Sequence, residues 1–248
     1  MTEYLILAAA AFLAGILNTV AGGGTFLTFP ALVYTGVPPV AANATSAVAV
    51  FPGYLGGALG FRQEIAEFER GRLLKIVGVT AIGGLVGSLL LLVSSNEGFT
   101  VVVPFLLALA TMVFAFGSRI QAWAARHSLG NSDGPWGTLL VSIYGGYFNG
   151  GLGIVLLALF SLRGMRDINL MNGLKTGLSF VLSAISVATF AVAGIVEWPQ
   201  AIVMMVAATI GGYAGAPIAR ALPANVVKLI VVLVGATMSV AFFWRAFA

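Results

Sequence analysis

The sequence predicts an all-α polytopic membrane protein made of two inverted-topology repeats. Three observations support this fold class. First, 60% of the 248 residues are hydrophobic, only 8% are charged, and the mean hydropathy is +1.04, whereas a soluble domain carries about 25% charged residues. Second, apolar runs of roughly 17–25 residues, the length that spans a bilayer, recur along the chain. Third, the two halves of the chain share a weak internal repeat.

The repeat consists of four short matches that occur in the same order in both halves. Asn18 pairs with Asn149, Asn43 with Asn172, 82–87 with 210–215, and 110–112 with 236–238. The offsets are 131, 129, 128 and 126 residues, a slow drift that small deletions would produce. We therefore expect one integral membrane transport domain over 1–248, with repeat 1 at 1–118, repeat 2 at 134–248 and a polar cytoplasmic linker at 119–133.

Each half is expected to hold five helical segments. In the first half the segments are 4–20, 24–36, 41–61, 73–93 and 99–117. In the second half they are 135–149, 152–163, 172–194, 199–219 and 224–244. Most prolines fall at or near segment ends, where helices tolerate them.

The first two segments of each half are predicted to form a broken or re-entrant helical hairpin, followed by three transmembrane helices. A single helix over 4–36 would be about 50 Å long, against a hydrocarbon core of roughly 30 Å. Asn18-Thr19 and the three glycines at 22–24 are also poor helix formers. The polar stretch at 149–151 breaks the second half in the same way.

The distribution of Lys and Arg supports the two-piece reading. With two pieces per half, eleven of the twelve basic residues fall on or nearest to one face, and only Arg245 falls on the other. With one piece per half, the same residues divide seven against five. Because cytoplasmic loops are enriched in Lys and Arg, the basic face is expected to be cytoplasmic and both termini periplasmic.

The two breaks are the candidate substrate site. In an inverted repeat they enter from opposite faces and can meet near the midplane, where discontinuous helices of secondary transporters bind substrate. The start of each third segment would form the second wall. The candidate substrate-binding residues are Asn18, Thr19, Gly22, Gly23, Gly24, Thr25, Asn43, Thr45, Ser46, Asn149, Gly150, Gly151, Asn172, Lys175 and Thr176.

These residue types favour an anionic substrate. Helix N-termini offer unpaired N–H groups and partial positive charge, glycine allows close backbone approach, and Asn and Thr add neutral donors. No Asp or Glu lies deep in a predicted span, although a cation site would normally contain one. Lys175 could pair with the anion or extend to the cytoplasmic interface, and the sequence leaves both readings open.

Composition also bears on cofactors and on glycines outside the breaks. The chain has no cysteine and one histidine, and no GxxxxGK[ST] nucleotide-binding motif occurs, so no cofactor or metal is expected. Glycine pairs at 56–57, 83–84 and 211–212 are interpreted as helix-packing positions, because small residues let membrane helices approach closely.

The motif Asn18-Thr19-Val20-Ala21-Gly22-Gly23-Gly24-Thr25, followed by residues 36–38 and 41–46, resembles the TauE/SafE sulfite exporter family, also called the 4-toluene sulfonate uptake permease family. The resemblance covers nearly the whole chain. It implies transport of sulfite, sulfonates or related organosulfur anions across the bacterial inner membrane, without catalytic chemistry.

The leading hypothesis is therefore a secondary transporter with alternating access at a midplane site, and the alternative is a passive anion channel. A membrane-embedded enzyme is disfavoured because the spans contain no constellation of catalytic residues. An assembly subunit is a further alternative. The expected partners are a small anion and the lipid bilayer, with a homodimer possible and no nucleic acid.

Overall fold

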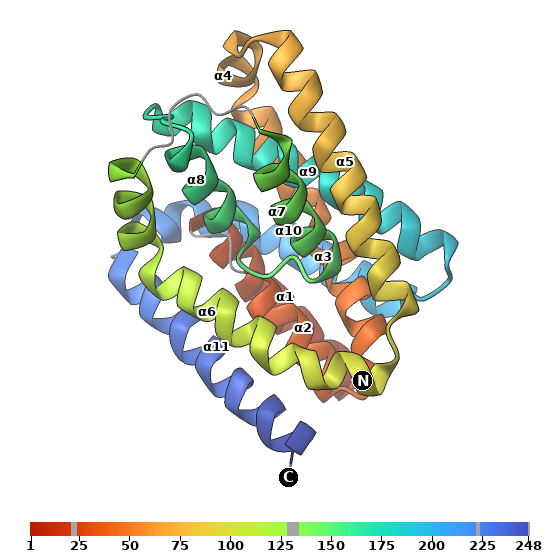
Figure 1. Cartoon of the computed structure of the whole chain (residues 1–248). Coiled ribbons are helices and arrows are strands. Elements are labelled where there is room, and N and C mark those ends of the chain that lie inside the picture. The colour runs from red at the N-terminus through yellow and green to blue at the C-terminus, as the bar shows by residue number, and fades with distance from the viewer. Residues whose placement is uncertain (21–23, 128–133, 222–223, 248) are drawn as a thin grey trace.

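The computed structural model describes residues 1–20, 24–127, 134–221 and 224–247. These residues form eleven helices (Figure 1). The helices are α1 (Thr2–Val20), α2 (Thr25–Tyr34), α3 (Pro39–Gly60), α4 (Arg62–Glu67), α5 (Arg70–Val93), α6 (Asn96–Arg126), α7 (Pro135–Tyr147), α8 (Leu152–Leu162), α9 (Ile168–Val192), α10 (Trp198–Ala221) and α11 (Ala224–Phe247). The predicted all-helical fold of a polytopic membrane protein is confirmed. Among the described residues, α5, α9 and 96–113 of α6 are long and apolar enough to cross a membrane.

Both predicted breaks are present. The first apolar segment divides into α1 and α2, and the corresponding segment of the second half divides into α7 and α8. α2 has 10 residues and α8 has 11, which gives helices about 15 to 17 Å long. Neither helix can cross a core of roughly 30 Å. Each short helix begins inside the protein, at the buried residues Thr25 and Leu152.

Some helix boundaries differ from those predicted. α6 continues to Arg126, nine residues past the predicted end at 117, because Ala, Gln and Arg in this stretch are good helix formers despite their polarity. The short helix α4, between α3 and α5, was not predicted. Its six residues are too few for a periodic hydrophobic pattern to be recognised.

The long helices pack in pairs. α1 packs on α10, α5 on α7, α3 on α9 and α6 on α11. At Gly211 an added Cβ would overlap the carbonyl oxygen of Phe12 in α1, and at Gly87 it would overlap that of Ile143 in α7. A side chain at either position would therefore separate the two backbones.

The packing interpretation is right for two of the three glycine pairs and partly wrong for the third. Gly83 lies against Ser142, Gly84 against Leu182, and Gly211 against α1. At Gly57 an added Cβ would lie 3.0 Å from the methyl carbon of Thr176, but at Gly56 it would meet nothing within 4 Å. Gly56 is exposed and is therefore not a close-packing position.

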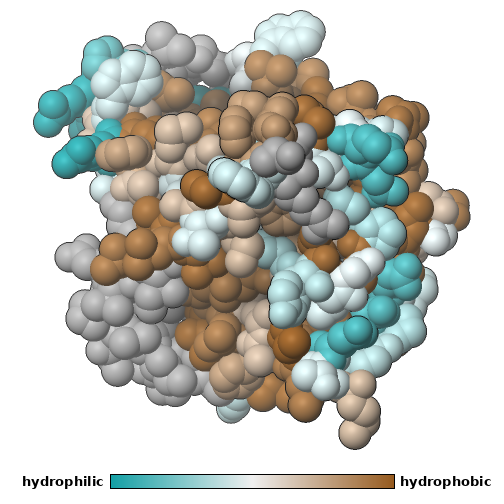
Figure 2. All heavy atoms as spheres, turned by 90° about the horizontal axis from the view of Figure 1, so that it is seen from below, coloured by the Kyte–Doolittle hydropathy of each residue, from teal (hydrophilic) through white to brown (hydrophobic). Residues whose placement is uncertain are grey.

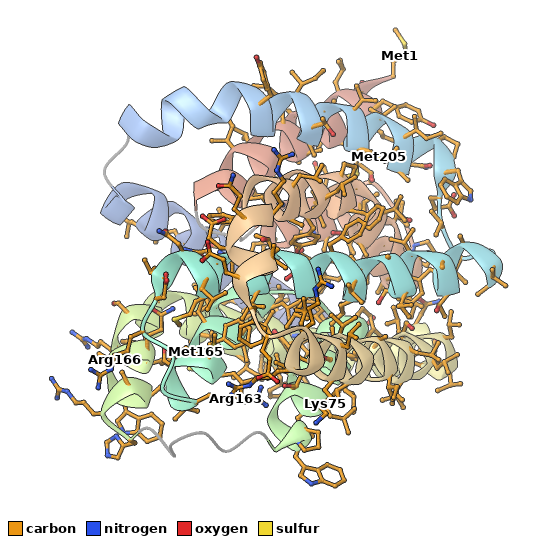
Figure 3. All side chains as sticks on the ribbon, turned by 90° about the horizontal axis from the view of Figure 1, so that it is seen from above. Met1, Lys75, Arg163, Met165, Arg166 and Met205 are labelled. Carbon is orange, nitrogen blue, oxygen red and sulfur yellow. The ribbon has the colours of Figure 1, made fainter. Side chains whose placement is uncertain are left out.

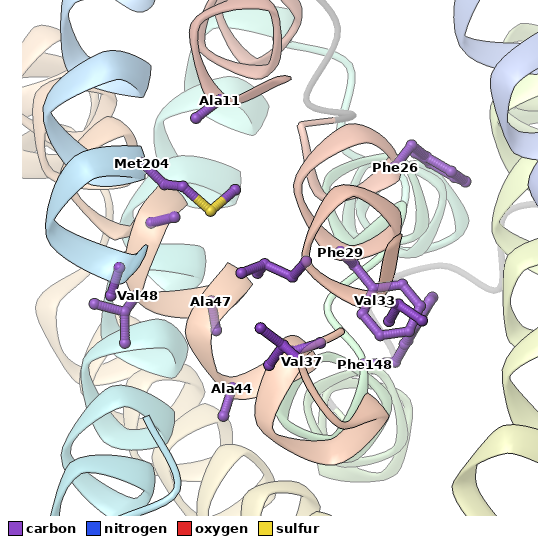
Figure 4. Close-up of a cluster of buried hydrophobic side chains, with 14 of the residues drawn as sticks. Ala11, Phe26, Phe29, Val33, Val37, Ala44, Ala47, Val48, Phe148 and Met204 are labelled. Carbon is purple, nitrogen blue, oxygen red and sulfur yellow. The ribbon is translucent and has the colours of Figure 1, made fainter. Parts of the chain in front are cut away.

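The buried apolar side chains form two clusters. The larger contains Phe29, Phe99 and Phe148, and Phe29 makes edge-to-face contacts with the other two rings. Figure 4 shows Phe29 and Phe148 beside Val33 and Val37 of the first half. The smaller cluster joins α8 and α9 through residues such as Leu156 and Leu178.

The outer surface suits a lipid environment. Large apolar side chains are exposed along α5, for example Ile82, Leu89 and Val93. Seen from below, hydrophobic residues cover much of the surface and hydrophilic ones gather in patches (Figure 2). The start of α1 and the end of α11 lie at the lower end of the molecule, opposite α4 (Figure 1).

Candidate functional site

In the first break, Asn18 near the end of α1 forms a hydrogen bond across to the residue before α2. Its Oδ1 accepts a hydrogen bond from the backbone N–H of Gly24 at 2.8 Å, and an added Cβ at Gly24 would lie 2.5 Å from the Asn18 Nδ2. Asn18 therefore binds the backbone just before α2, and Gly24 is needed for this close approach. The predicted residues Gly22 and Gly23, together with the side chain of Thr19, lie outside the described part of the chain.

In the second break, two residues adopt the left-handed backbone conformation. Asn149 has φ +62° and Gly151 has φ +70°. Asparagine is one of the few residues besides glycine that adopts this conformation readily. Asn149 is buried, and its Oδ1 accepts a long hydrogen bond of 3.5 Å from the Tyr54 hydroxyl. The Tyr144 hydroxyl donates to the carbonyl of Gly150.

The two breaks meet at a small central cavity. Its volume is about 10 Å³, and it is lined by Thr25, Asn43, Ala47, Gly145, Gly146, Phe148, Asn149, Leu182, Ser183, Ser186 and Phe190. Thr25 is the first residue of α2, and Asn149 lies in the second break. The structure thus brings three predicted residues together: Thr25, Asn43 and Asn149.

The polar groups around this cavity are neutral. Asn43 Nδ2 donates to the carbonyl oxygen of Tyr147 at the end of α7, at 2.8 Å. The hydroxyls of Ser183 and Ser186 on α9 are buried and have no hydrogen-bond partner within the described residues. Buried hydroxyls are nearly always paired, so these two are the groups best placed to contact a ligand.

Tyr54, Tyr144, Ser183 and Ser186 were not predicted as site residues. The spacing of the two serines contained a usable signal, because residues three apart lie on one face of a helix. Polar residues at helical spacing within an apolar segment indicate a polar face, and this one lines the cavity.

Two predicted residues, Thr45 and Ser46, are buried but do not line the central cavity. The Thr45 hydroxyl accepts a hydrogen bond from the backbone N–H of Glu197 at 3.0 Å, which ties α3 to the residue before α10. The Ser46 hydroxyl lies 2.6 Å from that of Thr28, which ties α3 to α2. Both side chains have partners that explain their burial.

Asn172, Lys175 and Thr176 form a separate polar group near the start of α8. Lys175 Nζ donates to Asn172 Oδ1 at 2.9 Å. An added Cβ at Gly153 would lie 3.2 Å from the Lys175 Cδ, so the stem of the lysine lies against the first turn of α8. The Thr176 hydroxyl donates to the carbonyls of Asn172 and Gly173.

The described residues contain no group of three His, Asp or Glu side chains that could hold a metal ion. The residues that line the central cavity are uncharged. The geometry is therefore that of a small, uncharged site between the two helix breaks, lined by both polar and apolar side chains.

Comparisons with known proteins agree with one another. The sequence model of the family described as "Sulfite exporter TauE/SafE" matches residues 7–242. A probable membrane transporter protein of Haemophilus influenzae is 27% identical over 238 residues, which cover 94% of this chain and 92% of that protein. The probable membrane transporter protein ORF9 of a Sinorhizobium species is 25% identical, covering 93% and 88%. The probable membrane transporter protein YfcA of Escherichia coli K12 is 26% identical, covering 92% and 85%. No solved structure matches the chain significantly.

Proposed function

Because the chain belongs to the sulfite exporter TauE/SafE family, we propose that it is a secondary transporter of sulfite, sulfonates or related organosulfur anions. The observation that carries this proposal is the central cavity, where Thr25 and Asn149, one from each helix break, meet Asn43 of α3. Irregular backbone inside a membrane protein is tolerated where it is buried in protein or lines a cavity. Here residues of both breaks line one uncharged cavity.

Helix dipoles support an anionic substrate. α2 begins at Thr25, in the wall of the cavity, and a helix N-terminus carries roughly half a positive charge. The cavity lining has no carboxylate to repel an anion. Lys175 adds a cation beside the first turn of α8, where a second helix dipole begins.

The packing of the helices supports two repeats of five elements each. We take α1, α2, α3, α5 and α6 of the first half to correspond, in this order, to α7, α8, α9, α10 and α11 of the second half. Each pair of helices in contact should then have an equivalent pair that is also in contact. The α1–α10 contact becomes α7–α5, the α3–α10 contact becomes α9–α5, and α6–α8 becomes α11–α2. All six contacts are present, as two repeats around a shared site would require.

The small volume of the cavity favours a carrier over a passive channel. About 10 Å³ suffices for roughly one water molecule, and not for a sulfonate group. The helices must therefore rearrange to admit the substrate. A carrier that alternates access undergoes such a rearrangement, whereas an open anion channel keeps a path wide enough for the anion.

Flux into proteoliposomes tests the proposal. Vesicles containing only this protein should take up labelled sulfite, taurine or an aryl sulfonate with saturable kinetics, whereas protein-free vesicles should not. Asn149→Leu should abolish the flux while the protein remains folded in the membrane. The absence of saturable flux for sulfur oxyanions and simple carboxylates alike would contradict the proposal, and unitary currents far above carrier turnover would support the channel.

A further inference from the structure

A second cavity lies away from the central site, between the first turns of α5 and α7 and the end of α8. Its volume is about 180 Å³, and it is lined by Glu69, Arg72, Lys75, Ile76, Val79, Pro135, Thr138 and Arg163. Three of these side chains are cationic and one is a carboxylate, which gives a formal charge of +2. None of the eight residues lines the central cavity.

Two of the three cations are held in place by contacts with neighbouring groups. Arg163, which is 8% exposed, donates from Nη2 to the carbonyl of Gly134 and to the Thr138 hydroxyl, both at 2.8 Å. The guanidinium of Arg72 lies over the Phe68 ring, 5.7 Å from its centroid. Lys75 follows Arg72 by three residues, so both lie on one face of α5. Figure 3 shows Lys75 and Arg163 at the same edge of the molecule.

Helix dipoles add to this positive charge. α5 begins at Arg70 and α7 begins at Pro135, so both positive helix ends lie at the cavity. The negative end of α8, at Leu162, offsets only one of them. With three cationic side chains already lining it, the cavity is suited to a phosphate-sized anion.

The surroundings of the cavity are apolar and exposed. Leu74 on α5 is 71% exposed, and Trp136 and Leu140 on α7 are 72% and 66% exposed. Tryptophan is enriched at the boundary between lipid and water, and basic pockets between transmembrane helices bind lipid headgroups. A ligand here would combine an anionic group with an apolar body.

We propose that this cavity binds the headgroup of an anionic phospholipid, with Arg72, Lys75 and Arg163 contacting the phosphate. The acyl chains would lie along the exposed apolar faces of α5 and α7. The site is separate from the transport cavity, and its occupation does not depend on which anion the protein transports.

Native mass spectrometry of the purified protein tests the site. In detergent, phosphatidylglycerol and phosphatidylcholine are titrated against the wild-type protein and two double variants. Arg72→Gln/Lys75→Gln removes two cations from the cavity. The control Arg119→Gln/Arg126→Gln removes two exposed cations from α6, so the net charge of the two variants is equal.

The wild-type protein should retain phosphatidylglycerol in preference to phosphatidylcholine. The cavity variant should bind phosphatidylglycerol on the order of 25-fold more weakly, about fivefold for each charge, and the control should match the wild type. Thermal unfolding in the same detergent should show that both variants are folded.

Three outcomes would overturn the proposal. Equal loss of affinity in both double variants would assign the effect to diffuse surface charge. Displacement of the lipid by equimolar inorganic phosphate would indicate a site for soluble anions. Equal retention of the two lipids by the wild-type protein would mean that the cavity does not select an anionic headgroup.

Discussion

Ser183 and Ser186 place two buried hydroxyls at the central cavity without a partner in the described structure. An unpaired buried hydroxyl costs about 1–3 kcal/mol, and a bound anion that accepts hydrogen bonds from both would recover that cost. A purely structural role does not account for this arrangement, because neither hydroxyl makes a hydrogen bond with any of the described residues.

Replacing these hydroxyls should separate transport from stability. Ser183→Ala/Ser186→Ala should weaken the apparent affinity for the transported anion by about tenfold or more, since a hydrogen bond to a charged group contributes about 1.5–3 kcal/mol. Its thermal unfolding temperature should stay the same or rise. Ser179→Ala, on the same helix and equally buried but outside the cavity lining, is the control. Normal transport by the double variant would exclude the serines from the site.

Asn149 combines a backbone role with a side-chain role, and two substitutions distinguish them. Asn149→Gly keeps the left-handed φ of +62° but removes the amide, so transport should fall while the melting temperature changes little. Asn149→Leu should also destabilise the protein by about 1–2 kcal/mol, because a bulky residue is strained in this conformation. Flux assays and thermal unfolding measure the two effects. Full transport by the glycine variant would mean that the amide does not contact substrate.

At the site, the sequence could predict that Asn149 and Thr25 lie near the cavity. Both residues are next to a helix break, and glycine and asparagine residues mark each break in the sequence. The sequence could not show that Asn43 lines the cavity whereas Thr45 binds the residue before α10. The two lie two residues apart on α3, and only the packing of neighbouring helices decides which side chain faces the cavity.

At the scale of the helix, glycine determines how closely α5 approaches α7. A methyl group at Gly87 would overlap the Ile143 carbonyl oxygen, whereas one at Gly56 would meet open space. The same substitution should therefore have opposite effects at the two positions.

Gly87→Ala should destabilise the protein by about 1–3 kcal/mol, the usual cost of overpacking. Gly56→Ala should be neutral or stabilise α3 by up to about 1 kcal/mol, because alanine has the higher helix propensity. Thermal unfolding of both variants in one detergent provides the comparison. Equal melting temperatures would mean that α5 and α7 can separate at no cost.

Helix breaks were easier to predict than helix ends. Asn18 and the adjacent glycines interrupt an apolar run that is too long for one crossing, and a break is the direct consequence. The end of α6 carries no such signal, because Gln121 and Arg126 are as compatible with a helix as with a polar linker. Helix α4 is fixed by its neighbours, and Phe61 before it packs against Gly173 of α9.

At the scale of the whole molecule, the start of α1 and the end of α11 share one end (Figure 1). The basic residues 62, 70 and 72 lie at or near α4, at the opposite end. Because positive charge favours the cytoplasmic side, we propose that the α4 end is cytoplasmic and that both termini are periplasmic.

Cysteine labelling can test this orientation directly, since the chain contains no cysteine of its own. Ser95, between α5 and α6, and Arg166, between α8 and α9, are both exposed, so either accepts a single cysteine without disturbing the core. α5 leads away from the α4 end, so Ser95→Cys should react with a membrane-impermeant maleimide on the periplasmic side. Arg166→Cys follows α8, which leads back toward the basic face, and should react only in inside-out vesicles. Labelling of both variants from the same side would contradict the proposed topology, and labelling with the sides exchanged would place both termini in the cytoplasm.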